Sequence, residues 1–553
     1  MKRLPIGVDD FKQAVENYYY IDKSLFIKEL LDNHSAVTLI TRPRRFGKTM
    51  NMSMLDYFFS MEQKDTSALF QNLAIAQVNN GKYLTERNQY PVIFLTLKDV
   101  QNDTWDMMLE SFKLLISSEY QKHAYLLKTN CLESYEKDFF LRILNKNANA
   151  AEYQVSLAYL MMYLTRYHHK EPIVLIDEYD APLQYAHQFH FYPSAISYFR
   201  TFYNKSLKGN KYLKFAVLTG VLRIAKESIF SGLNNLEVDT VTADKYSDVF
   251  GFTQEEVTQI CKEYGQLDSL DQLKFWYDGY HFGKSEIYNP WSIINYFNNQ
   301  CSPKPYWVNT SSNSIIRYLL TKTDPLKLRA LLQLMKGQDI QVPINESVVY
   351  DDIATDKTAL FSMLLTTGYL TTANTPTELP NSISLKIPNE EIRQLYKTEI
   401  MNHMISHFTQ YEFDYMFTAL VSGNKEDFAE YLRTIIEQSV SSFDTGSHEC
   451  FYHALLLGML AGFNGPKYQI LSNREAGFGR FDIAIVPNDN TLPGVILELK
   501  YADNETALPQ KAKEALAQIH AKAYDKYPDF HGVKTIWHYG IAFHGKHLYV
   551  EMD

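Results

Sequence analysis

The chain has 553 residues, of which 46% are hydrophobic and 21% charged, and its 54 Lys and Arg against 64 Asp and Glu give a net charge of −10. This composition is typical of a folded protein with several domains, and it excludes a largely disordered chain. The acidic balance also argues against a protein that coats nucleic acid by bulk charge, because affinity for the phosphate backbone comes from Lys and Arg.

The N-terminus and the cysteines favour a cytoplasmic protein without a membrane anchor. The opening residues, MKRLPIGVDDF, contain no apolar run, and the most apolar stretch, residues 454–463, is about half as long as a bilayer-spanning helix. The four cysteines lie far apart without a CxxC pair, which indicates neither a disulfide framework nor a zinc ribbon. We therefore expect a reducing compartment and no membrane partner.

Four short apolar runs predict an α/β domain in residues 1–295. Amphipathic, helix-like spans separate these runs, and continuous apolar runs of this length are typical of buried parallel strands. The runs are 36–41 (AVTLIT), 92–97 (VIFLTL), 172–177 (PIVLID) and 213–219 (LKFAVLT).

A phosphate-binding loop is predicted directly after the first strand. The sequence RPRRFGKT, residues 42–49, ends like a GxxxxGK[ST] motif, although Arg42 occupies the first glycine position. A helical run follows, and a helix N-terminus presents backbone N–H groups to an anion. In this interpretation Lys48 reaches the phosphates of ATP and the Thr49 hydroxyl binds Mg²⁺. The predicted nucleotide contacts of the loop are Arg44, Arg45, Gly47, Lys48 and Thr49.

Two further strand ends supply the rest of a nucleotide site. Asp177 ends the third run and Glu178 follows it; Asp177 would hold Mg²⁺ and Glu178 would orient or deprotonate a water. The fourth run ends at Thr219, with Arg223 shortly after it, and ligands of open α/β sheets bind at this carboxyl edge. A basic loop or a solvated strand end explains either motif alone, but the ordered pair favours nucleotide binding.

Residues 296–400 predict a helical domain that ends like a winged helix. The segment 360–369 (LFSMLLTTGY) predicts a helix stopped by Gly368, and the runs YLTTA and SISLKIP then flank the polar turn TPTELPN. A small packing domain that positions its neighbours explains this pattern at least as well as nucleic-acid binding does.

Residues 401–553 predict a compact αβα domain with its own core. Helical spans come first, and the strands 480–486 (RFDIAIV) and 495–501 (VILELKY) follow on either side of a turn. A helix over 510–524 and two last strands, around 535–543 and 548–551, complete the pattern.

A pair of charged residues inside one of these strands predicts a catalytic metal site. Glu498 and Lys500 share one face of their strand because side chains alternate with a period of two, and charge on a mostly buried sheet is costly unless it is used. Asp482 lies across the hairpin from Glu498. Two carboxylates can hold Mg²⁺ or Mn²⁺, and a lysine can orient water and stabilise negative charge. A solvated strand end is the other interpretation.

Flanking helices add candidates to this site. Glu449 begins the apolar helix ECFYHALLLGMLAG as a further acidic ligand, while Gln518 and Tyr524 lie on the helix after the core strands. Residues 401–553 contain 12 Lys and Arg against 19 Asp and Glu, which is poor for a domain that grips a duplex alone. We therefore expect this domain to bind nucleic acid weakly without metal. The histidines show no ligand spacing with Cys or Glu and are interpreted as surface or core residues.

Taken together, these residues resemble a family of bacterial proteins that join an AAA-ATPase-like domain to a C-terminal PD-(D/E)xK nuclease-like domain. The resemblance covers nearly the whole chain. It is carried by LPIGVDDF, YYYIDKSLFIKELL, RPRRFGKT, LIDEYDAPL, LTGVLRIAKESIFSGLNNL, WYDGYHFG, YNPWSIINYF, YWVNTSSN, GYLT, LKIPNEE, GRFDIAIVP, GVILELK and AQIHAKAY.

The resemblance implies a P-loop NTPase-like parallel-sheet domain at 1–295, a helical, winged-helix-like domain at 296–400 and a restriction-endonuclease-like αβα domain at 401–553. It also implies that the missing first glycine is typical of the family. The residues to which it assigns roles are Lys48 and Thr49 for phosphate and metal, Asp177 and Glu178 as the acidic pair, and Asp482, Glu498 and Lys500 as the nuclease core, with Glu449 and Gln518 beside it.

We therefore expect an ATP-binding, Mg²⁺- or Mn²⁺-dependent nuclease whose first domain regulates phosphodiester hydrolysis by the third. The expected partner is nucleic acid, with DNA favoured over RNA, and a homo-oligomer is compatible with the sequence. Two alternatives stay open: a non-catalytic, nucleotide-dependent switch with a nuclease-like docking domain, and an ATPase motor without nuclease activity.

Overall fold

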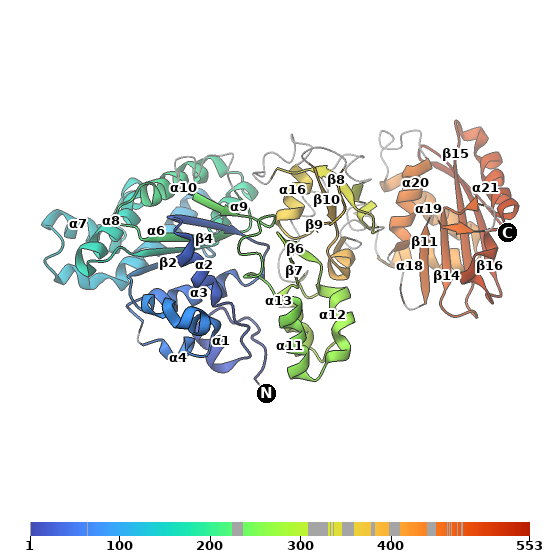
Figure 1. The fold of residues 1–553 in the computed structure, drawn as a ribbon. Helices are drawn as coiled ribbons and strands as arrows, with labels where there is room; N and C mark the ends of the chain where they lie inside the picture. The colour runs from blue at the N-terminus through green and yellow to red at the C-terminus, as the bar shows by residue number, and fades with distance from the viewer. Residues whose placement is uncertain are drawn as a thin grey trace. The chain divides into compact units, whose positions relative to one another are not determined.

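The chain divides into two compact units, each with its own β-sheet. The first comprises residues 1–312 and 339–392, and the second comprises 313–338 and 393–553. The computed structural model (Figure 1) describes residues 2–63, 65–223, 236–307, 330–331, 333–335, 337–345, 359–377, 382–396, 410–439, 449–461, 463, 465, 467–472, 474–476 and 479–553. No helix in these ranges is long and apolar enough to cross a membrane.

A five-stranded parallel sheet forms the centre of the first unit. Its strand order is β2-β3-β4-β1-β5, and all neighbouring strands pair in parallel. Every residue of β1 and β3 is buried, as expected for strands covered on both faces, so the predicted α/β sheet is confirmed. The strands are β1 Val37–Thr41, β2 Val92–Thr96, β3 Ile173–Asp177, β4 Phe215–Gly220 and β5 Leu236–Asp239.

Helices connect these strands, and local capping explains where several of them begin. Asn149 and Glu152 form a capping box at the start of one helix, and Thr253 and Glu256 form another, so backbone N–H groups at both starts are satisfied by side chains. The helices are α1 Phe11–Asn17, α2 Leu25–Asn33, α3 Lys48–Phe59, α4 Ser67–Phe70, α5 Ala74–Gln77, α6 Trp105–Lys122, α7 Ser134–Leu144, α8 Ala150–His168, α9 Ala181–Gln188, α10 Tyr192–Leu207, α11 Gln254–Tyr264, α12 Leu270–Tyr277 and α13 Pro290–Asn298.

The predicted helix-plus-hairpin is present and belongs to the first unit. Helix α16 (Ala359–Thr366) ends before Gly368, which has a φ of +86°, a conformation that favours glycine. Strands β9 (Thr371–Thr372) and β10 (Ser382–Lys386) pair antiparallel, and β8 (Ile340–Pro343) joins them in the order β8-β10-β9. This arrangement is winged-helix-like. The short strands β6 (Tyr280–Phe282) and β7 (Ser285–Ile287) form a separate hairpin.

The second unit is an αβα sandwich around a mixed sheet of order β11-β14-β15-β16-β17. Strands β15 and β16 pair in parallel, and the other neighbours pair antiparallel. The bounds are β11 Tyr468–Ser472, β14 Ile483–Pro487, β15 Gly494–Tyr501, β16 Ile536–His544, β17 His547–Met552, α18 Gln410–Ser422, α19 Lys425–Ser439, α20 Glu449–Ala461 and α21 Leu508–Lys522, with a small ribbon of β12 (Glu475–Ala476) and β13 (Gly479–Arg480).

Alternate side chains of this sheet enter two different cores. Val495, Leu497 and Leu499 pack with the apolar residues of α18, α19 and α20. Ile496 lies on the opposite face, in a core with Ile519 of α21. The predicted alternation is confirmed, and it places Glu498 and Lys500 on the face that α21 covers.

Helix α21 approaches this face closely at Gly540, the residue of β16 opposite Glu498. A Cβ atom on Gly540 would lie 2.2 Å from the carbonyl oxygen of Ala512 and 2.5 Å from the backbone nitrogen of Leu516. Since both atoms belong to the helix backbone, a side chain here must push α21 away from the sheet.

We expect Gly540→Ala to lower the free energy of unfolding of the second unit by about 1–3 kcal/mol, the usual cost of overpacking. Urea denaturation measures this change. Gly465→Ala is the matched control, because a Cβ atom there meets no heavy atom within 4 Å. Equal stability of the two variants would show that α21 is not held against Gly540.

Candidate nucleotide and nuclease sites

The loop between β1 and α3 has the backbone of an anion-binding loop. Gly47 has a φ of +84° and Arg45 a φ of +68°, both in the left-handed region, and α3 begins directly afterwards at Lys48. Successive N–H groups in such a turn converge on one side, at the positive end of the helix dipole. A Cβ atom on Gly47 would meet nothing within 4 Å, so the backbone angle and not crowding favours glycine here.

Backbone carbonyl groups of the loop hold the Lys48 side chain in place. Its Nζ donates hydrogen bonds to the carbonyl oxygens of Arg42 and Pro43, at 2.9 and 2.8 Å. Burial lowers the pKa of Lys48, while the negative charges of Glu178 and Asp177 act in the opposite direction. A buried ammonium group at the N-terminus of a helix is suited to bind phosphate.

Asp177, the last residue of β3, contacts both β4 and the start of α3 at the carboxyl edge of the sheet. Its Oδ2 accepts a hydrogen bond from the Thr49 hydroxyl at 2.7 Å, and its Oδ1 accepts one from the hydroxyl of Thr219. Strand β4, which carries Thr219, lies between β1 and β3, so this contact requires the observed strand order. The structure therefore brings Lys48, Thr49, Asp177 and Thr219 together.

The two acidic residues that follow Asp177 closely have different surroundings. Glu178 has a φ of +53°, and burial raises the pKa of its carboxyl group, whereas the charge of Lys48 lowers it. Asp180, which sequence analysis did not single out, accepts hydrogen bonds from the N–H groups of Val221 and Leu222 at 3.0 and 2.8 Å. Asp180 thus ties the chain after β3 to the chain after β4.

Arg42 is a structural residue and adds no charge to the surface of the loop. Its guanidinium is fully buried, donates to the Asp239 carboxylate at 2.5 Å and also donates to the carbonyl oxygens of Thr41 and Thr240. The departure from the glycine motif is therefore matched by a carboxylate at the end of β5. The positive charge of Arg42 is therefore neutralised inside the protein by the Asp239 carboxylate.

The three predicted arginines, Arg44, Arg45 and Arg223, have different surroundings. Arg44 donates to the Gln184 side chain of α9 at 3.1 Å, and the Arg45 guanidinium lies 4.3 Å from the centre of the Trp291 ring on α13. Arg223 is partly buried three residues after β4, and no hydrogen bond between described residues joins it to Lys48 or Asp177. Arg44 and Arg45 thus contact α9 and α13, respectively.

In the second unit, the hairpin β14–β15 brings the predicted carboxylates face to face. Ile483 pairs with Leu497, and continuing this antiparallel register by one residue places Asp482 opposite Glu498. The Asp482 Oδ2 atom accepts a hydrogen bond from the backbone N–H of Leu499 at 2.8 Å, which fixes the carboxylate across the hairpin.

Glu498 is the buried centre of this site, with 3% of its surface exposed. Its Oε1 atom accepts a hydrogen bond from the Gln518 amide of α21, and the Lys500 Nζ atom lies 4.0 Å from the same oxygen. Gln518 also donates to the Tyr524 hydroxyl at 3.3 Å. Burial raises the pKa of Tyr524, and the negative charges of Glu498 and Asp482 raise it further. Asp482, Glu498, Lys500, Gln518 and Tyr524 thus form one cluster.

Helix α20 contributes a residue that sequence analysis missed. The Nε2 atom of His453 lies 3.1 Å from the carbonyl oxygen of Asp482 and 3.0 Å from the Ser472 hydroxyl. Glu449 begins this helix, as predicted, and residues four apart share a helix face, so its backbone lies one turn before His453. The Glu449 side chain lies outside the described part of the structure.

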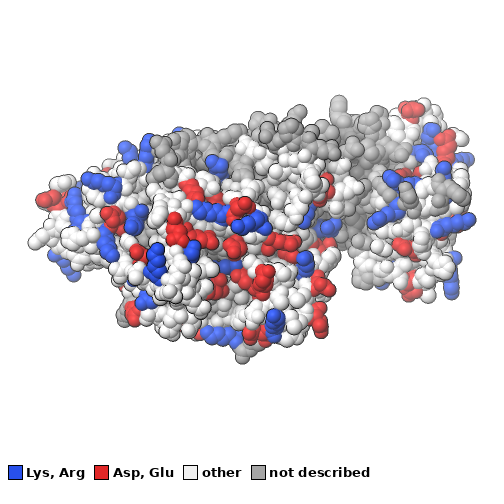
Figure 2. Space-filling view, in the orientation of Figure 1, with Lys and Arg blue, Asp and Glu red and all other residues white. Residues whose placement is uncertain are grey.

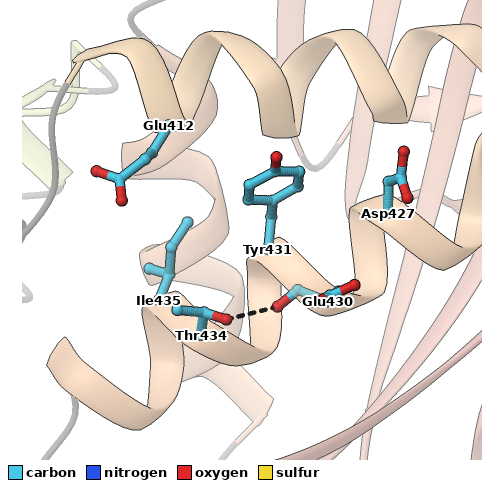
Figure 3. Close-up of a pocket in the computed structure, with 6 residues that line it drawn as sticks. All are labelled: Glu412, Asp427, Glu430, Tyr431, Thr434 and Ile435. Carbon is cyan, nitrogen blue, oxygen red and sulfur yellow. Dashed lines mark hydrogen bonds between the residues drawn. The ribbon is translucent and has the colours of Figure 1, made fainter.

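A hollow elsewhere on the second unit contains none of the predicted residues. It lies between α18 and α19, and three carboxylates, Glu412, Asp427 and Glu430, line it together with Tyr431, Thr434 and Ile435 (Figure 3). Like charge repels phosphate, so this hollow does not suit a nucleic-acid backbone. On the face in view, acidic and basic side chains are intermixed over the second unit (Figure 2).

The donor atoms of both clusters suit hard divalent cations. Asp482 and Glu498 offer carboxylate oxygens from facing strands, and Thr49 and Asp177 offer a hydroxyl and a carboxylate beside the phosphate-binding loop. Mg²⁺ and Mn²⁺ prefer oxygen ligands of this kind. The residues present therefore fit the expected ions.

Comparisons with known proteins agree with these two clusters. Residues 5–230 match the family model described as Predicted AAA-ATPase, and residues 447–552 match the PD-(D/E)XK nuclease superfamily. The chain joins an AAA-ATPase-like domain to a PD-(D/E)XK nuclease superfamily domain. The resemblance expected from the sequence is confirmed, and the two sites lie within the respective AAA-ATPase-like and PD-(D/E)XK regions.

One relative is similar over nearly the whole length of both chains. The chain is similar to the "Uncharacterized protein in vnfD 5'region" of Azotobacter chroococcum mcd 1, with 24% identity over 545 residues, which cover 95% of this chain and 94% of the relative. The similarity thus extends over the AAA-ATPase-like domain, the PD-(D/E)XK domain and the region between them.

Proposed function

We propose that this protein is a cytoplasmic, metal-dependent nuclease whose AAA-ATPase-like domain binds ATP and regulates cleavage. The observation that carries the proposal is the cluster of Asp482, Glu498 and Lys500, assembled on one face of a hairpin within the PD-(D/E)XK domain. The proposed substrate is nucleic acid, with DNA favoured. In this proposal, residues 1–295 bind ATP, residues 296–400 transmit the effect of ATP, and residues 401–553 cleave the substrate.

Asp482, Glu498, Lys500, Gln518 and Tyr524 have different roles in the proposed phosphodiester hydrolysis. Asp482 and Glu498 would hold Mg²⁺ or Mn²⁺, which when bound supplies Lewis-acid activation of the phosphate and of water. Lys500 orients the attacking water and stabilises negative charge on the phosphate. Gln518 positions the Glu498 carboxylate through its hydrogen bond, and Tyr524 holds Gln518 from the other side.

The ATP site would use the loop and the carboxyl edge of the parallel sheet. Lys48 and the N–H groups of the loop bind the phosphates, while Thr49 and Asp177 would hold Mg²⁺. Thr219 fixes the orientation of Asp177. Glu178 is the candidate base for hydrolysis, because it directly follows Asp177 at the carboxyl edge of the sheet and burial raises the pKa of its carboxyl group.

A buried connection supports regulation by ATP. The Trp307 indole N–H donates to the carbonyl oxygen of Arg44 at 3.0 Å, and the Trp307 backbone N–H donates to the Glu391 carboxylate at 2.7 Å. Glu391 also accepts a hydrogen bond from Ser292 at 2.7 Å. Trp307 and Glu391 lie shortly before the points, after 312 and after 392, where the chain leaves the first unit. A shift of the loop on binding ATP would thus reach Trp307 and Glu391, close to where the chain leaves the first unit.

Lys48→Ala tests the ATP site. We expect this variant to lose measurable ATP binding, because it removes the buried cation of the loop. Equilibrium binding of a fluorescent ATP analogue is the measurement, and Lys12→Ala, at an exposed lysine of α1, is the control. Parent-like affinity in Lys48→Ala would rule out the loop as the phosphate site.

A further inference from the structure

Two histidines and an aspartate form a second cluster of ligand-type side chains in the PD-(D/E)XK domain. His520 lies on α21, His538 on β16 and Asp553 directly after β17. One nitrogen of each imidazole and one carboxylate oxygen lie within 4.8 Å of one another. The sequence predicted that the histidines are surface or core residues, because they show no ligand spacing with Cys or Glu.

Side-chain and backbone contacts hold this cluster together. Asp553 contacts the Nε2 atom of His520 at 2.9 Å with one carboxylate oxygen and the Nδ1 atom of His538 at 3.0 Å with the other. The backbones of His538 and Asp553 exchange two hydrogen bonds, at 3.0 and 3.1 Å. The two imidazole rings stand at 86° with their centres 4.9 Å apart. Two of the three ligands are thus fixed by the sheet and the third by a helix.

The cluster shares no donor atom with the nuclease site, although it lies near it. His538 is opposite Ile496 on β15, two residues from the pair of Gly540 and Glu498, which is about 7 Å along a strand. On α21, Gln518 and His520 flank the buried Ile519. The helix therefore contacts Glu498 through one side chain and Asp553 through the other.

We propose that His520, His538 and Asp553 bind Zn²⁺, or a similar first-row transition ion, and that this ion fixes the last turn of α21. Two imidazoles and one carboxylate are a donor set that zinc accepts, whereas Mg²⁺ prefers oxygen ligands. Tetrahedral coordination at zinc–ligand distances of about 2.0–2.1 Å separates ligand atoms by about 3.3 Å, so ligand atoms that now lie within 4.8 Å of one another would close by up to about 1.5 Å.

Two features of the surroundings favour a cation here. The side chain of His520 is 49% exposed, which leaves room for water at a remaining coordination position. The cluster also lies at the C-terminal end of α21, where the helix dipole stabilises positive charge. A bound ion would replace the hydrogen bonds that now join the two rings to Asp553.

Zinc binding by the full-length chain tests the proposal. The parent for this test carries Asp482→Ala and Glu498→Gln, so that the nuclease carboxylates do not contribute and the result is independent of cleavage. In isothermal titration with Zn²⁺ alone, we expect one ion per chain. Adding His520→Ala or His538→Ala should weaken binding at least about tenfold, because each removes a direct ligand. Zn²⁺ should also raise the Tm of the parent but not of the His520→Ala variant.

His547→Ala is the matched control, since His547 is an exposed histidine of β17 that pairs with Glu505 outside the cluster. It should leave both zinc affinity and the Tm shift unchanged. Unaltered zinc binding in the His520→Ala variant, or no saturable binding in the parent, would overturn the proposal. Because His520 is half-exposed, its replacement leaves the core intact and the comparison interpretable.

Discussion

Glu498→Gln is expected to lower the Mg²⁺-dependent cleavage rate by at least about a hundredfold while leaving the fold intact. Gln keeps the size of Glu498 and a partner for Gln518 but removes the negative charge that would hold the metal. Lys500→Ala should have a comparable effect, because it removes the cation nearest this carboxylate. Single-turnover cleavage of a labelled substrate measures the rate, and circular dichroism checks the fold.

A control for this result lies on the neighbouring helix. Glu514→Gln alters an exposed carboxylate of α21 that pairs with Lys511, and it should retain parent-like cleavage. If Glu498→Gln and Lys500→Ala both cleaved like the parent protein, the catalytic residues would have to lie elsewhere. If Glu498→Gln were inactive because it does not fold, Lys500→Ala would test the catalytic site instead, because Lys500 is partly exposed and its replacement disturbs the fold less.

Asp239→Ala is expected to destabilise the first unit by about 3–5 kcal/mol, because it leaves the buried charge of Arg42 without its carboxylate. The side chains of Arg42 and Asp239 are 0% and 2% exposed, so water cannot replace the lost partner. The carbonyl oxygens of Thr41 and Thr240 keep some hydrogen bonds but carry no net charge. Urea denaturation followed by the signal of the first unit measures the loss.

Two further variants separate charge burial from a general effect of substitution. Replacing both partners, with Arg42→Met and Asp239→Leu, should recover much of the stability because no buried charge remains. Glu110→Ala removes an exposed partner of Lys113 and should cost less than about 1 kcal/mol. A loss in Asp239→Ala no larger than in Glu110→Ala would contradict the assigned role of Arg42.

The sequence predicted the parts of the fold that depend on short-range patterns. Apolar runs located β1 to β4, and the alternation around Glu498 located the face of the second sheet that carries charge. The strand β5 was missed because its sequence, LEVD, is short and half acidic. Its Asp239 explains Arg42, but the two residues lie 197 positions apart and no local signal connects them.

The residues of the candidate sites were also predictable only where a short-range pattern in the sequence marks them. Asp482 and Glu498 could be paired because a hairpin joins them. Lys48 and Asp177 could be paired because Lys48 follows one apolar strand and Asp177 ends another. His453 and the cluster around Asp553 were missed, since their contacts arise only when separate helices and strands pack together. Asp180 was missed because its role is to bind backbone N–H groups, which leaves no pattern in the sequence.

The most direct test of the proposed function is single-turnover cleavage of DNA and RNA substrates with Mg²⁺, in the presence and absence of ATP, by the parent protein, Lys48→Ala and Glu498→Gln. We predict cleavage by the parent at a rate that ATP changes, cleavage by Lys48→Ala that does not respond to ATP, and only background cleavage by Glu498→Gln. Parent-like cleavage by Glu498→Gln, or an undiminished ATP effect in Lys48→Ala, would contradict an ATP-regulated PD-(D/E)XK nuclease.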